Sequence, residues 1–434
     1  MQSDVKTNPR ALALDLLIKA EKAKQFSNIA LDKALQDSSL SDVDRRLASA
    51  LFYGVTEKKI TLDYRISRLS SRPLEQIDDH TLNVLRIGLY QLIFTDRIPP
   101  HAAINETVSL CPRRTAGFVN GILRAHTRKV QDEFPSKDTD TVKYLSVKYS
   151  VCEELCRRFL NEFGTERTES IFASLDTPPL TTLRVNTLKT TRDGLAANVP
   201  SAEKTKLSPN GLKVKGSVRE LYGFDDGLFF VQDEASQLCV EALDAKAGMT
   251  VLDICACPGS KSFGAAINMQ NVGSVTSFDL HMSKLSLIKS GAERLGIDII
   301  SVREQDGRKN IPELTGSADR VLCDVPCSGF GVLAKKPELR YKDPAVSDAL
   351  PKIQLDILNN ACQYVKRGGV LVYSTCTVFA AENQDNIKLF LKSHPDFELT
   401  PFRIGELFVS EGYVTLMPDE YPTDGFFIAK LTRK

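Results

Sequence analysis

The strongest constraint on this chain is an apolar run at residues 250–254, which contains Asp253 and is followed at once by Cys-Ala-Cys-Pro-Gly-Ser-Lys-Ser. This order is typical of a strand, a tight turn and the start of a helix. Gly259 allows the backbone to approach a ligand, and the N–H groups of a first helical turn bind anionic or polar groups. A second run, 274–278, leads into Asp279, where an open α/β sheet places the carboxylate that binds ribose hydroxyls. The pattern favours a nucleotide-type site, with a purely structural βα unit as the alternative.

Two further apolar runs end beside cysteines. Residues 320–325 lead into Cys327, and residues 370–373 lead into Cys376. Because the carboxyl ends of parallel strands form the edge at which such sheets bind ligands, we expect both thiols to face one site. For any single cysteine the alternative is burial as a small apolar residue.

The carboxy-terminal part of the chain, residues 231–434, alternates apolar runs with helical patterns. Such alternation predicts an α/β domain with a mostly parallel, doubly wound sheet of the Rossmann-like kind. The last two runs, joined by residues 418–424, predict a hairpin that adds an antiparallel edge. The expected strands are 250–254, 274–279, 298–303, 320–325, 369–374, 412–417 and 425–431.

The first 130 residues predict helices, and the clearest apolar stripe covers residues 79–95. Residues 132–140 are polar and contain a proline, which predicts a linker. Ser150 with Glu153 predicts a capping box at the start of the following helix. We therefore expect an all-helical domain at 1–135, a small α+β domain at 141–230 and the sheet domain at 231–434.

The net charge is only +1, but residues 97–130 hold a local excess of basic side chains with a single acid, Glu106. A basic face suits phosphate contacts, although many such clusters are merely a solvated helix face. The candidate phosphate-contacting residues are Arg97, Arg113, Arg114, Arg124, Arg128 and Lys129.

The composition is 42% hydrophobic and 26% charged, without an apolar stretch of about 18 residues, which predicts a cytoplasmic protein without a membrane segment. The ten cysteines lack the arrangement of a secreted disulfide framework, so we expect reduced thiols. The five histidines are scattered and paired CxxC spacings are missing, so we expect no metal site.

Two thiols and a carboxylate at one sheet edge suit a particular reaction. C5 of cytosine is too weak a nucleophile to be methylated unaided, and addition of a thiolate at C6 makes it enamine-like. It can then attack an electrophilic methyl group. An acid that holds or protonates N3, best supplied by Asp324, stabilises the adduct, and a second basic group removes the C5 proton.

Three motifs carry a family resemblance. Residues 253–262 resemble D-x-C-A-A-P-G-G-K-T, residues 324–329 resemble D-x-P-C-S-G, and residues 373–377 resemble Y-S-T-C-S, in the order found in RNA cytosine-5 methyltransferases. The resemblance implies S-adenosylmethionine as cofactor, Cys376 as nucleophile, and Cys327 as the group that assists proton removal and product release. The implied cofactor-binding residues are Cys255, Ala256, Cys257, Pro258, Gly259, Ser260, Lys261, Asp279, Asp306 and Asp324, the last of which would also serve the target base.

The front half resembles one branch of that family. Residues 100–108 and 118–124 are similar to the helical, NusB-like RNA-binding domain of the bacterial Fmu/Sun branch. The resemblance implies a monomeric enzyme that modifies a cytosine in 16S rRNA, either naked or in an early assembly intermediate. Cys257, Ser260 and Ser262 replace the family's Ala, Gly and Thr. Because Ser260 adds a Cβ, cofactor affinity is the property that these changes would alter first.

Three alternatives remain open at this point. A transfer-RNA cytosine-5 methyltransferase would share the chemistry but not the NusB-like front half. A non-catalytic RNA-binding or ribosome assembly factor would have a decayed cofactor loop and would not bind S-adenosylmethionine. A thiol redox enzyme is the third.

Overall fold

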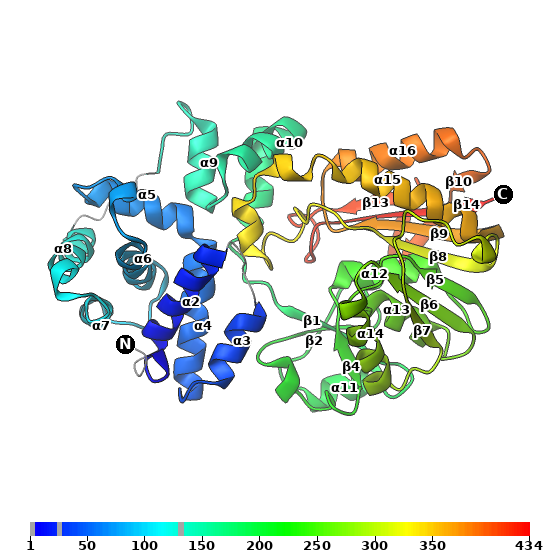
Figure 1. Cartoon of the computed structure of the whole chain (residues 1–434), viewed down its shortest axis with the longest axis horizontal. Coiled ribbons are helices and arrows are strands. Elements are labelled where there is room, and N and C mark those ends of the chain that lie inside the picture. The colour runs from blue at the N-terminus through cyan, green and yellow to red at the C-terminus, as the bar shows by residue number, and fades with distance from the viewer. Residues whose placement is uncertain (1–4, 24–27, 129–133) are drawn as a thin grey trace. The chain divides into compact units, whose positions relative to one another are not determined.

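The computed structural model describes residues 5–23, 28–128 and 134–434, and the chain divides into two units. The helical unit comprises Met1–Asp176 and Lys336–Asp343, and the sheet unit comprises Thr177–Lys335 and Pro344–Lys434 (Figure 1). The chain therefore passes between the units three times.

The helical unit packs amphipathic helices around a shared apolar core. In helix α6, Leu85 and Leu89 of the predicted stripe are fully buried, and Asp78 caps the helix by accepting the Thr81 N–H at 3.0 Å. The described helices of this unit are α2 (Pro9–Ala23), α3 (Asn28–Gln36), α4 (Asp42–Glu57), α5 (Lys59–Leu69), η1 (Leu74–Gln76), α6 (Asp79–Phe94), α7 (Pro100–Val108), α8 (Arg113–Arg128), α9 (Thr141–Tyr149), α10 (Glu153–Ser174) and η4 (Pro337–Tyr341).

The predicted capping box at Ser150 is wrong. Ser150 ends α9 in the left-handed region with φ 57°, and the residue that precedes α10 is Cys152. The Ser150 hydroxyl instead accepts the N–H of Ile60 at 2.9 Å, so a tertiary contact replaces the expected local cap. Within α10, Gly164 adopts φ 73° and ψ 176°, which interrupts the helix.

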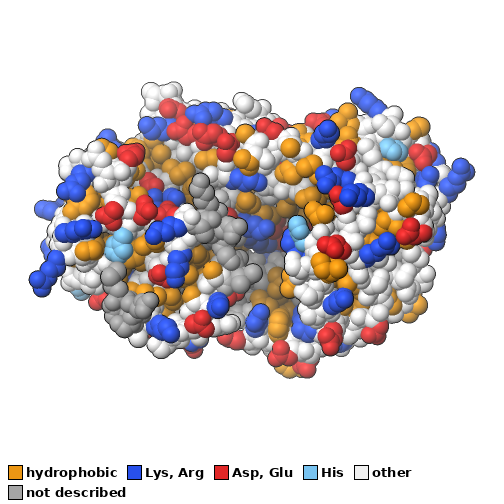
Figure 2. Space-filling model, viewed as in Figure 1, with side chains coloured by type: hydrophobic (Ala, Val, Ile, Leu, Met, Phe, Trp, Pro, Cys, Tyr) orange, Lys and Arg blue, Asp and Glu red, His pale blue; other side chains and the backbone are white. Residues whose placement is uncertain are grey.

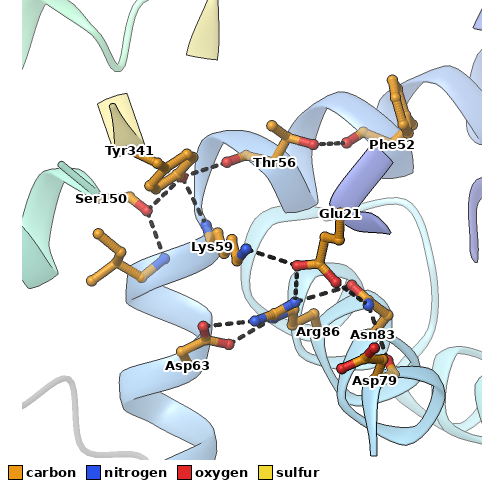
Figure 3. A network of polar contacts seen from close by, with 11 residues as sticks. Glu21, Phe52, Thr56, Lys59, Asp63, Asp79, Asn83, Arg86, Ser150 and Tyr341 are labelled. Carbon is orange, nitrogen blue, oxygen red and sulfur yellow. Dashed lines mark hydrogen bonds and ion pairs between the residues drawn. The ribbon is translucent and has the colours of Figure 1, made fainter. Parts of the chain in front are cut away.

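A charged network lies inside the helical unit, centred on Arg86 (Figure 3). The Arg86 guanidinium donates to Asp63 with Nε to Oδ1 at 2.7 Å and Nη2 to Oδ2 at 2.8 Å, and its Nη1 donates to Glu21 at 2.8 Å. Lys59 also pairs with Glu21, at 2.7 Å. Burial would raise the pKa of Glu21, but Arg86 and Lys59 hold it at about 2. The network joins α2, α5 and α6 through one buried arginine.

Replacing Arg86 with alanine is expected to destabilise the helical unit by about 3 kcal/mol, because Asp63 and Glu21 would lose their shared cation. The loss should appear in hydrogen exchange as reduced protection of the α5 and α6 amides. Arg157→Ala is the matched control, since the Arg157 side chain is 53% exposed and pairs only at the surface. Equal protection in both variants would contradict the structural role of Arg86.

Residues Lys336–Asp343, here called the excursion, belong to the helical unit although the chain before and after them belongs to the sheet unit. Tyr341 and Arg340 anchor this segment to the other helices of the helical unit. The Tyr341 hydroxyl donates to the Thr56 carbonyl and lies 3.0 Å from the Ser150 hydroxyl (Figure 3). Arg340 is 1% exposed, and its Nη1 donates to the Glu57 carbonyl at 3.2 Å. A segment between two sheet-unit elements is thus part of the helical unit.

The sheet unit begins with a small antiparallel sheet in the order β2-β3-β1-β4. Leu183, Leu212 and Phe229 fill its core. Its elements are β1 (Thr181–Val185), α11 (Arg192–Asn198), β2 (Glu203–Lys204), β3 (Gly211–Val214), η2 (Val218–Glu220) and β4 (Phe229–Val231).

The main sheet has eight strands in the order β10-β14-β9-β8-β5-β6-β7, with β13 also paired to β14. Strands β7, β6, β5, β8 and β9 are parallel, whereas β14 is antiparallel to β9, β10 and β13. This confirms the predicted parallel sheet with an antiparallel edge. The strands are β5 (Thr250–Asp253), β6 (Ser274–Asp279), β7 (Ile300–Glu304), β8 (Ala318–Asp324), β9 (Val365–Thr375), β10 (Phe397–Leu399), β13 (Tyr413–Leu416) and β14 (Phe426–Arg433), with β11 (Phe402–Ile404) and β12 (Leu407–Val409) forming a separate hairpin.

Helices cover both faces of the main sheet (Figure 1). Alternate strand residues enter two cores: Val251 and Leu322 belong to the core with α12, α13 and α14, whereas Leu252 and Val321 belong to the core with α15 and α16. The helices are α12 (Glu234–Leu243), α13 (Ser260–Asn268), α14 (Met282–Leu295), η3 (Pro312–Leu314), η5 (Pro344–Ser347), α15 (Leu350–Ala361), η6 (Cys362–Tyr364), η7 (Ala380–Glu382) and α16 (Gln384–Ser393).

Candidate active site

The carboxyl ends of β5 and β8 lie side by side where the strand order reverses. The chain runs outward from β5 to β6 and β7, then returns to place β8 on the other side of β5. Such a reversal opens a crevice at the strand ends, which is where doubly wound sheets bind ligands. The loops at this edge carry the predicted groups.

The loop after β5 turns sharply into α13. Gly259 has φ 103°, a conformation that L side chains rarely adopt, and a Cβ there would come within 2.8 Å of the Phe263 ring. Ser260, by contrast, begins the helix without a positive φ, so its Cβ is compatible with the backbone. The peptide bond between Cys257 and Pro258 is cis. The turn thus needs a glycine at 259 but not at 260.

Asp253 and Ser262 tie the strand to the helix. The Ser262 hydroxyl donates to Asp253 Oδ2 at 2.6 Å and accepts from the Ser277 hydroxyl at 2.8 Å. Burial raises the pKa of Asp253 to about 7, and the hydrogen bond from Ser262 opposes that rise. Ser262 therefore supplies the hydroxyl that a threonine would supply at this position.

Asp279 is the last residue of β6, and Asp306 lies two residues after the end of β7. Asp279 accepts the Cys257 N–H at 3.3 Å and the His281 N–H at 3.0 Å, which brings it against the loop after β5. Asp306 is held by the guanidinium of Arg308 at 2.8 and 2.9 Å, and this contact lowers its pKa to about 2. Both carboxylates lie at the same sheet edge, as predicted.

Lys261 and Asp324 form a partly buried ion pair. Lys261 Nζ lies 2.6 Å from Asp324 Oδ2, and the lysine side chain is 10% exposed. Burial lowers the pKa of Lys261, but the charge of Asp324, its hydrogen bond to Lys261 and the nearby Asp253 and Cys239 together outweigh burial, so the net shift is upward. The Ser374 hydroxyl donates to the other Asp324 oxygen at 2.6 Å. Asp324 therefore connects the loop after β5 to the end of β9.

The two predicted thiols meet at this edge. Cys327 Sγ and Cys376 Sγ are 3.1 Å apart, and the Cys376 N–H donates to Cys327 Sγ at 3.3 Å. Both residues are partly exposed. The pKa of Cys327 is raised well above its usual value, first by its contact with the Cys376 thiol and then by burial.

A second charged cluster was missed by the sequence reasoning. Lys335 binds the carboxylates of Asp233 and Asp424, the latter at 2.9 Å, and Asp233 accepts the Thr423 hydroxyl at 2.7 Å. Gly331 N donates to the Cys376 carbonyl at 2.9 Å. The cluster ties the segment after Cys327 to α12 and β14. Its only sequence signals are an aspartate before a helix and another before a strand.

Asp424 is expected to make stability depend on pH. Burial and the Asp233 carboxylate raise the pKa of Asp424 to about 7, and Lys335 only partly opposes this. Because the unfolded value is about 3.9, the folded chain retains a proton that the unfolded chain loses, so this contribution to stability falls as pH rises toward 7. The Tm of the wild type relative to Asp424→Asn should fall from pH 5 to pH 8. The exposed control Asp226→Asn should leave the relative Tm constant, and a constant difference for Asp424→Asn would contradict the assignment.

The predicted phosphate-contacting residues lie in the helical unit. Arg113, Arg114, Arg124 and Arg128 are exposed on α8, and Arg97 is exposed between α6 and α7. Lys129 lies outside the described residues. On the face shown in Figure 2, basic and acidic side chains are interspersed.

Two features of the described chain bear on partners. Every helix in residues 5–23, 28–128 and 134–434 is too short or too polar to cross a bilayer. Within the same ranges, no cluster of three or more His, Cys, Asp or Glu side chains is arranged to hold a metal ion.

The parallel strands, the antiparallel β14 beside β9 and the acids at the strand ends define the sheet unit as a Rossmann-like S-adenosylmethionine-dependent methyltransferase domain. The chain matches the 16S rRNA methyltransferase RsmB/F family over residues 240–432, the NusB family over 7–128, and the ferredoxin-like domain of RsmF/B-like methyltransferases over 153–219. It belongs to the ribosomal RNA small subunit methyltransferase B family.

Full-length relatives support this assignment. A protein of Bacillus subtilis (strain 168) named "Probable ribosomal RNA small subunit methyltransferase B" is 39% identical over 99% of each chain. The ribosomal RNA small subunit methyltransferase B of Salmonella typhi is 31% identical over 98% of this chain and 97% of its own. The solved structure of PH0851 has a TM-score of 0.78 and 28% identity over 98% of this chain and 99% of that chain. NSun6 from Pyrococcus horikoshii with SFG, at 22% identity over 65% of this chain and 98% of its own and TM-score 0.59, shares the fold.

Proposed function

We propose that this protein methylates C5 of a specific cytosine in 16S rRNA with S-adenosylmethionine as the methyl donor, and that it acts as a monomer. The observation that carries the proposal is the pair of thiols, Cys327 and Cys376, 3.1 Å apart at the ends of β8 and β9. Asp324 ends β8 three residues before Cys327, and its carboxylate accepts from Ser374, two residues before Cys376. These are the groups that cytosine C5 methylation requires.

Cys376 is the nucleophile in this proposal. Its thiolate adds to C6, and the displaced electron pair makes C5 nucleophilic. Asp324, held by Lys261 and Ser374, binds or protonates N3 and stabilises the adduct. Loss of the C5 proton to Cys327, followed by cleavage of the bond between Cys376 Sγ and C6, restores the C5=C6 double bond and frees the enzyme.

The residues at the strand ends suit the cofactor. S-adenosylmethionine supplies an electrophilic methyl group on a sulfonium sulfur. Asp279 would bind the ribose hydroxyls, and Asp306 and Asp324 would complete the cofactor site. The loop from Cys255 to Lys261 would pass close to the ligand at Gly259, whose positive φ keeps that approach open. Since Ser260 fits the helix start and Ser262 retains the hydroxyl, the replacements in this loop are compatible with binding.

RNA recognition is assigned to the helical unit. The match to the NusB family and the exposed arginines of α8 support this part of the proposal. Arginines bind phosphates bidentately, and their contacts make affinity depend on salt. The names of the full-length relatives support small-subunit rRNA as the substrate.

The test is to incubate the purified protein with radiolabelled S-adenosylmethionine and either transcribed 16S rRNA or bulk transfer RNA, and then to locate the modified base. Label on C5 of one cytosine in the rRNA is the expected result. Label on transfer RNA alone would retain the chemistry and overturn the substrate. Failure to label either RNA, together with no binding of S-adenosylmethionine in calorimetry, would indicate a non-catalytic RNA-binding factor.

A further inference from the structure

A buried carboxylate lies behind the loop that carries Cys327. Glu382, the last residue of η7, is 1% exposed. Its Oε2 accepts the Ser328 N–H at 2.9 Å and the Gln354 side-chain N–H at 2.8 Å. Ser328 directly follows Cys327, so Glu382 fixes the backbone next to that thiol. Burying a carboxylate costs free energy unless hydrogen bonds or opposite charges replace its lost hydration. The burial of Glu382 therefore calls for a structural or functional explanation.

The titratable groups that act on Cys327 come from β9, from the residue that follows β9 and from η7. They are the Cys376 thiol, the Glu382 carboxylate and the Tyr373 phenol. After the Cys376 contact and burial, the negative charge of Glu382 is a further cause of the raised pKa of Cys327. Tyr373 is uncharged, because burial raises its own pKa, and its hydroxyl donates to the Glu382 carbonyl at 2.6 Å. The Cys376 N–H, which donates to Cys327 Sγ at 3.3 Å, opposes this rise in pKa. The net shift is upward, which favours the neutral thiol at Cys327.

A neutral Cys327 has a direct effect on its neighbour. With Sγ atoms 3.1 Å apart, the Cys327 S–H can donate to Cys376 Sγ. A donated hydrogen bond stabilises a thiolate, and the thiolate is the reactive form of cysteine. Two adjacent thiols that would otherwise be equivalent thus become a donor and an acceptor.

We propose that Glu382 is a positioning residue that holds the Cys327 loop and keeps the shared proton of the thiol pair on Cys327, so that Cys376 is the sulfur that attacks. This inference rests on the proposed function, whose two cysteine roles it explains. Glu382 touches neither the substrate nor the cofactor in this scheme, and it acts through Cys327.

The arrangement also orders the steps of the cycle. Once Cys376 Sγ is bonded to C6 it is uncharged and no longer opposes ionisation of Cys327. The Cys327 proton then passes to water, and the resulting thiolate accepts the proton from C5. Cys327 is a neutral thiol again when the bond between Cys376 and C6 breaks, so it can donate to the departing thiolate. One proton is released to water in each cycle, as methyl transfer to a neutral base from a sulfonium requires.

The test is the pH dependence of cysteine alkylation in the full-length protein. Brief exposure to iodoacetamide at a series of pH values, followed by mass spectrometry of peptides, gives the initial rate at each cysteine. In the wild type, Cys376 should react at lower pH than Cys327. In Glu382→Gln, which preserves the side-chain shape, the midpoint for Cys327 should fall by about one pH unit, or roughly tenfold faster reaction below the midpoint.

Three controls accompany this measurement. Asp385→Asn removes an exposed carboxylate three residues away and should leave the Cys327 midpoint unchanged. Glu382→Asp restores the charge with a shorter reach and should return the midpoint toward the wild-type value, which loop packing alone would not do. Cys323 is fully buried in the same segment, so its alkylation reports any unfolding of the variant.

The outcomes separate this inference from the proposed function. An unchanged Cys327 midpoint in Glu382→Gln with Cys323 protected would overturn the role of Glu382, as would an equal shift in Asp385→Asn. If Glu382→Gln unfolds, the test rests on Glu382→Asp. A wild-type Cys327 midpoint in that variant, with Cys323 still protected, supports the role of the carboxylate charge, and a lowered Cys327 midpoint overturns that role. A protein that methylates no RNA would refute the proposed function without altering any of these midpoints.

Discussion

Cys376→Ser is expected to abolish methylation of 16S rRNA, lowering the rate by at least about 10³-fold. A serine hydroxyl ionises far less readily than a thiol, so it cannot add to C6 of cytosine near neutral pH. Without that addition C5 stays unreactive, however well the cofactor is bound. The measurement is single-turnover transfer of radiolabel from S-adenosylmethionine to transcribed rRNA, with excess enzyme.

The same variant should still bind S-adenosylmethionine, since the cofactor residues of the proposal lie on the loops after β5, β6, β7 and β8. Calorimetry should give a Kd close to that of the wild type. Cys362→Ser is the matched control, because Cys362 is a buried cysteine between α15 and β9. Normal methylation by Cys376→Ser would remove Cys376 from the mechanism.

The architecture of the sheet unit could be predicted because its strands are short apolar runs separated by turn residues. The runs at 250–254 and 274–279 match β5 and β6 almost residue for residue. The antiparallel edge followed from two runs joined by a short connection. The strand β10 and the hairpin β11–β12 were not predicted, because three-residue strands carry too little periodicity to stand out.

The excursion Lys336–Asp343 shows where local patterns lose their power. Nothing in its sequence distinguishes it from a surface loop, yet Arg340 is 1% exposed among helices far away in the chain. The capping box predicted at Ser150 is wrong for the same reason, because the Ser150 hydroxyl accepts the N–H of Ile60 and does not cap the helix that follows it. Tertiary contacts decided both cases.

The residues of the candidate site also fall into two groups: those whose positions follow from local sequence patterns and those positioned by tertiary contacts. The thiols, Asp279, Asp306 and Asp324 follow strand ends, so the rule for parallel sheets brings them to one edge. Lys335 and Glu382 follow no strand directly and gain their positions from packing. Their partners, Asp424 and Ser328, lie 89 and 54 residues away in the sequence. Only the folded chain brings these groups together.

Cys327→Ser should give the opposite result to Cys376→Ser, namely a covalent complex with the RNA. Cys376 can still add to C6, and the methyl group can still be transferred. Removal of the C5 proton then lacks the thiolate that should accept it, so the bond between Cys376 Sγ and C6 persists. The product is expected as a slowly migrating band of protein with RNA in denaturing electrophoresis, which carries the radiolabelled methyl group and is absent when Cys376 is also changed to serine. Because the two sulfurs are only 3.1 Å apart, geometry alone would allow their roles to be exchanged, and an adduct in Cys376→Ser but not in Cys327→Ser would require that exchange.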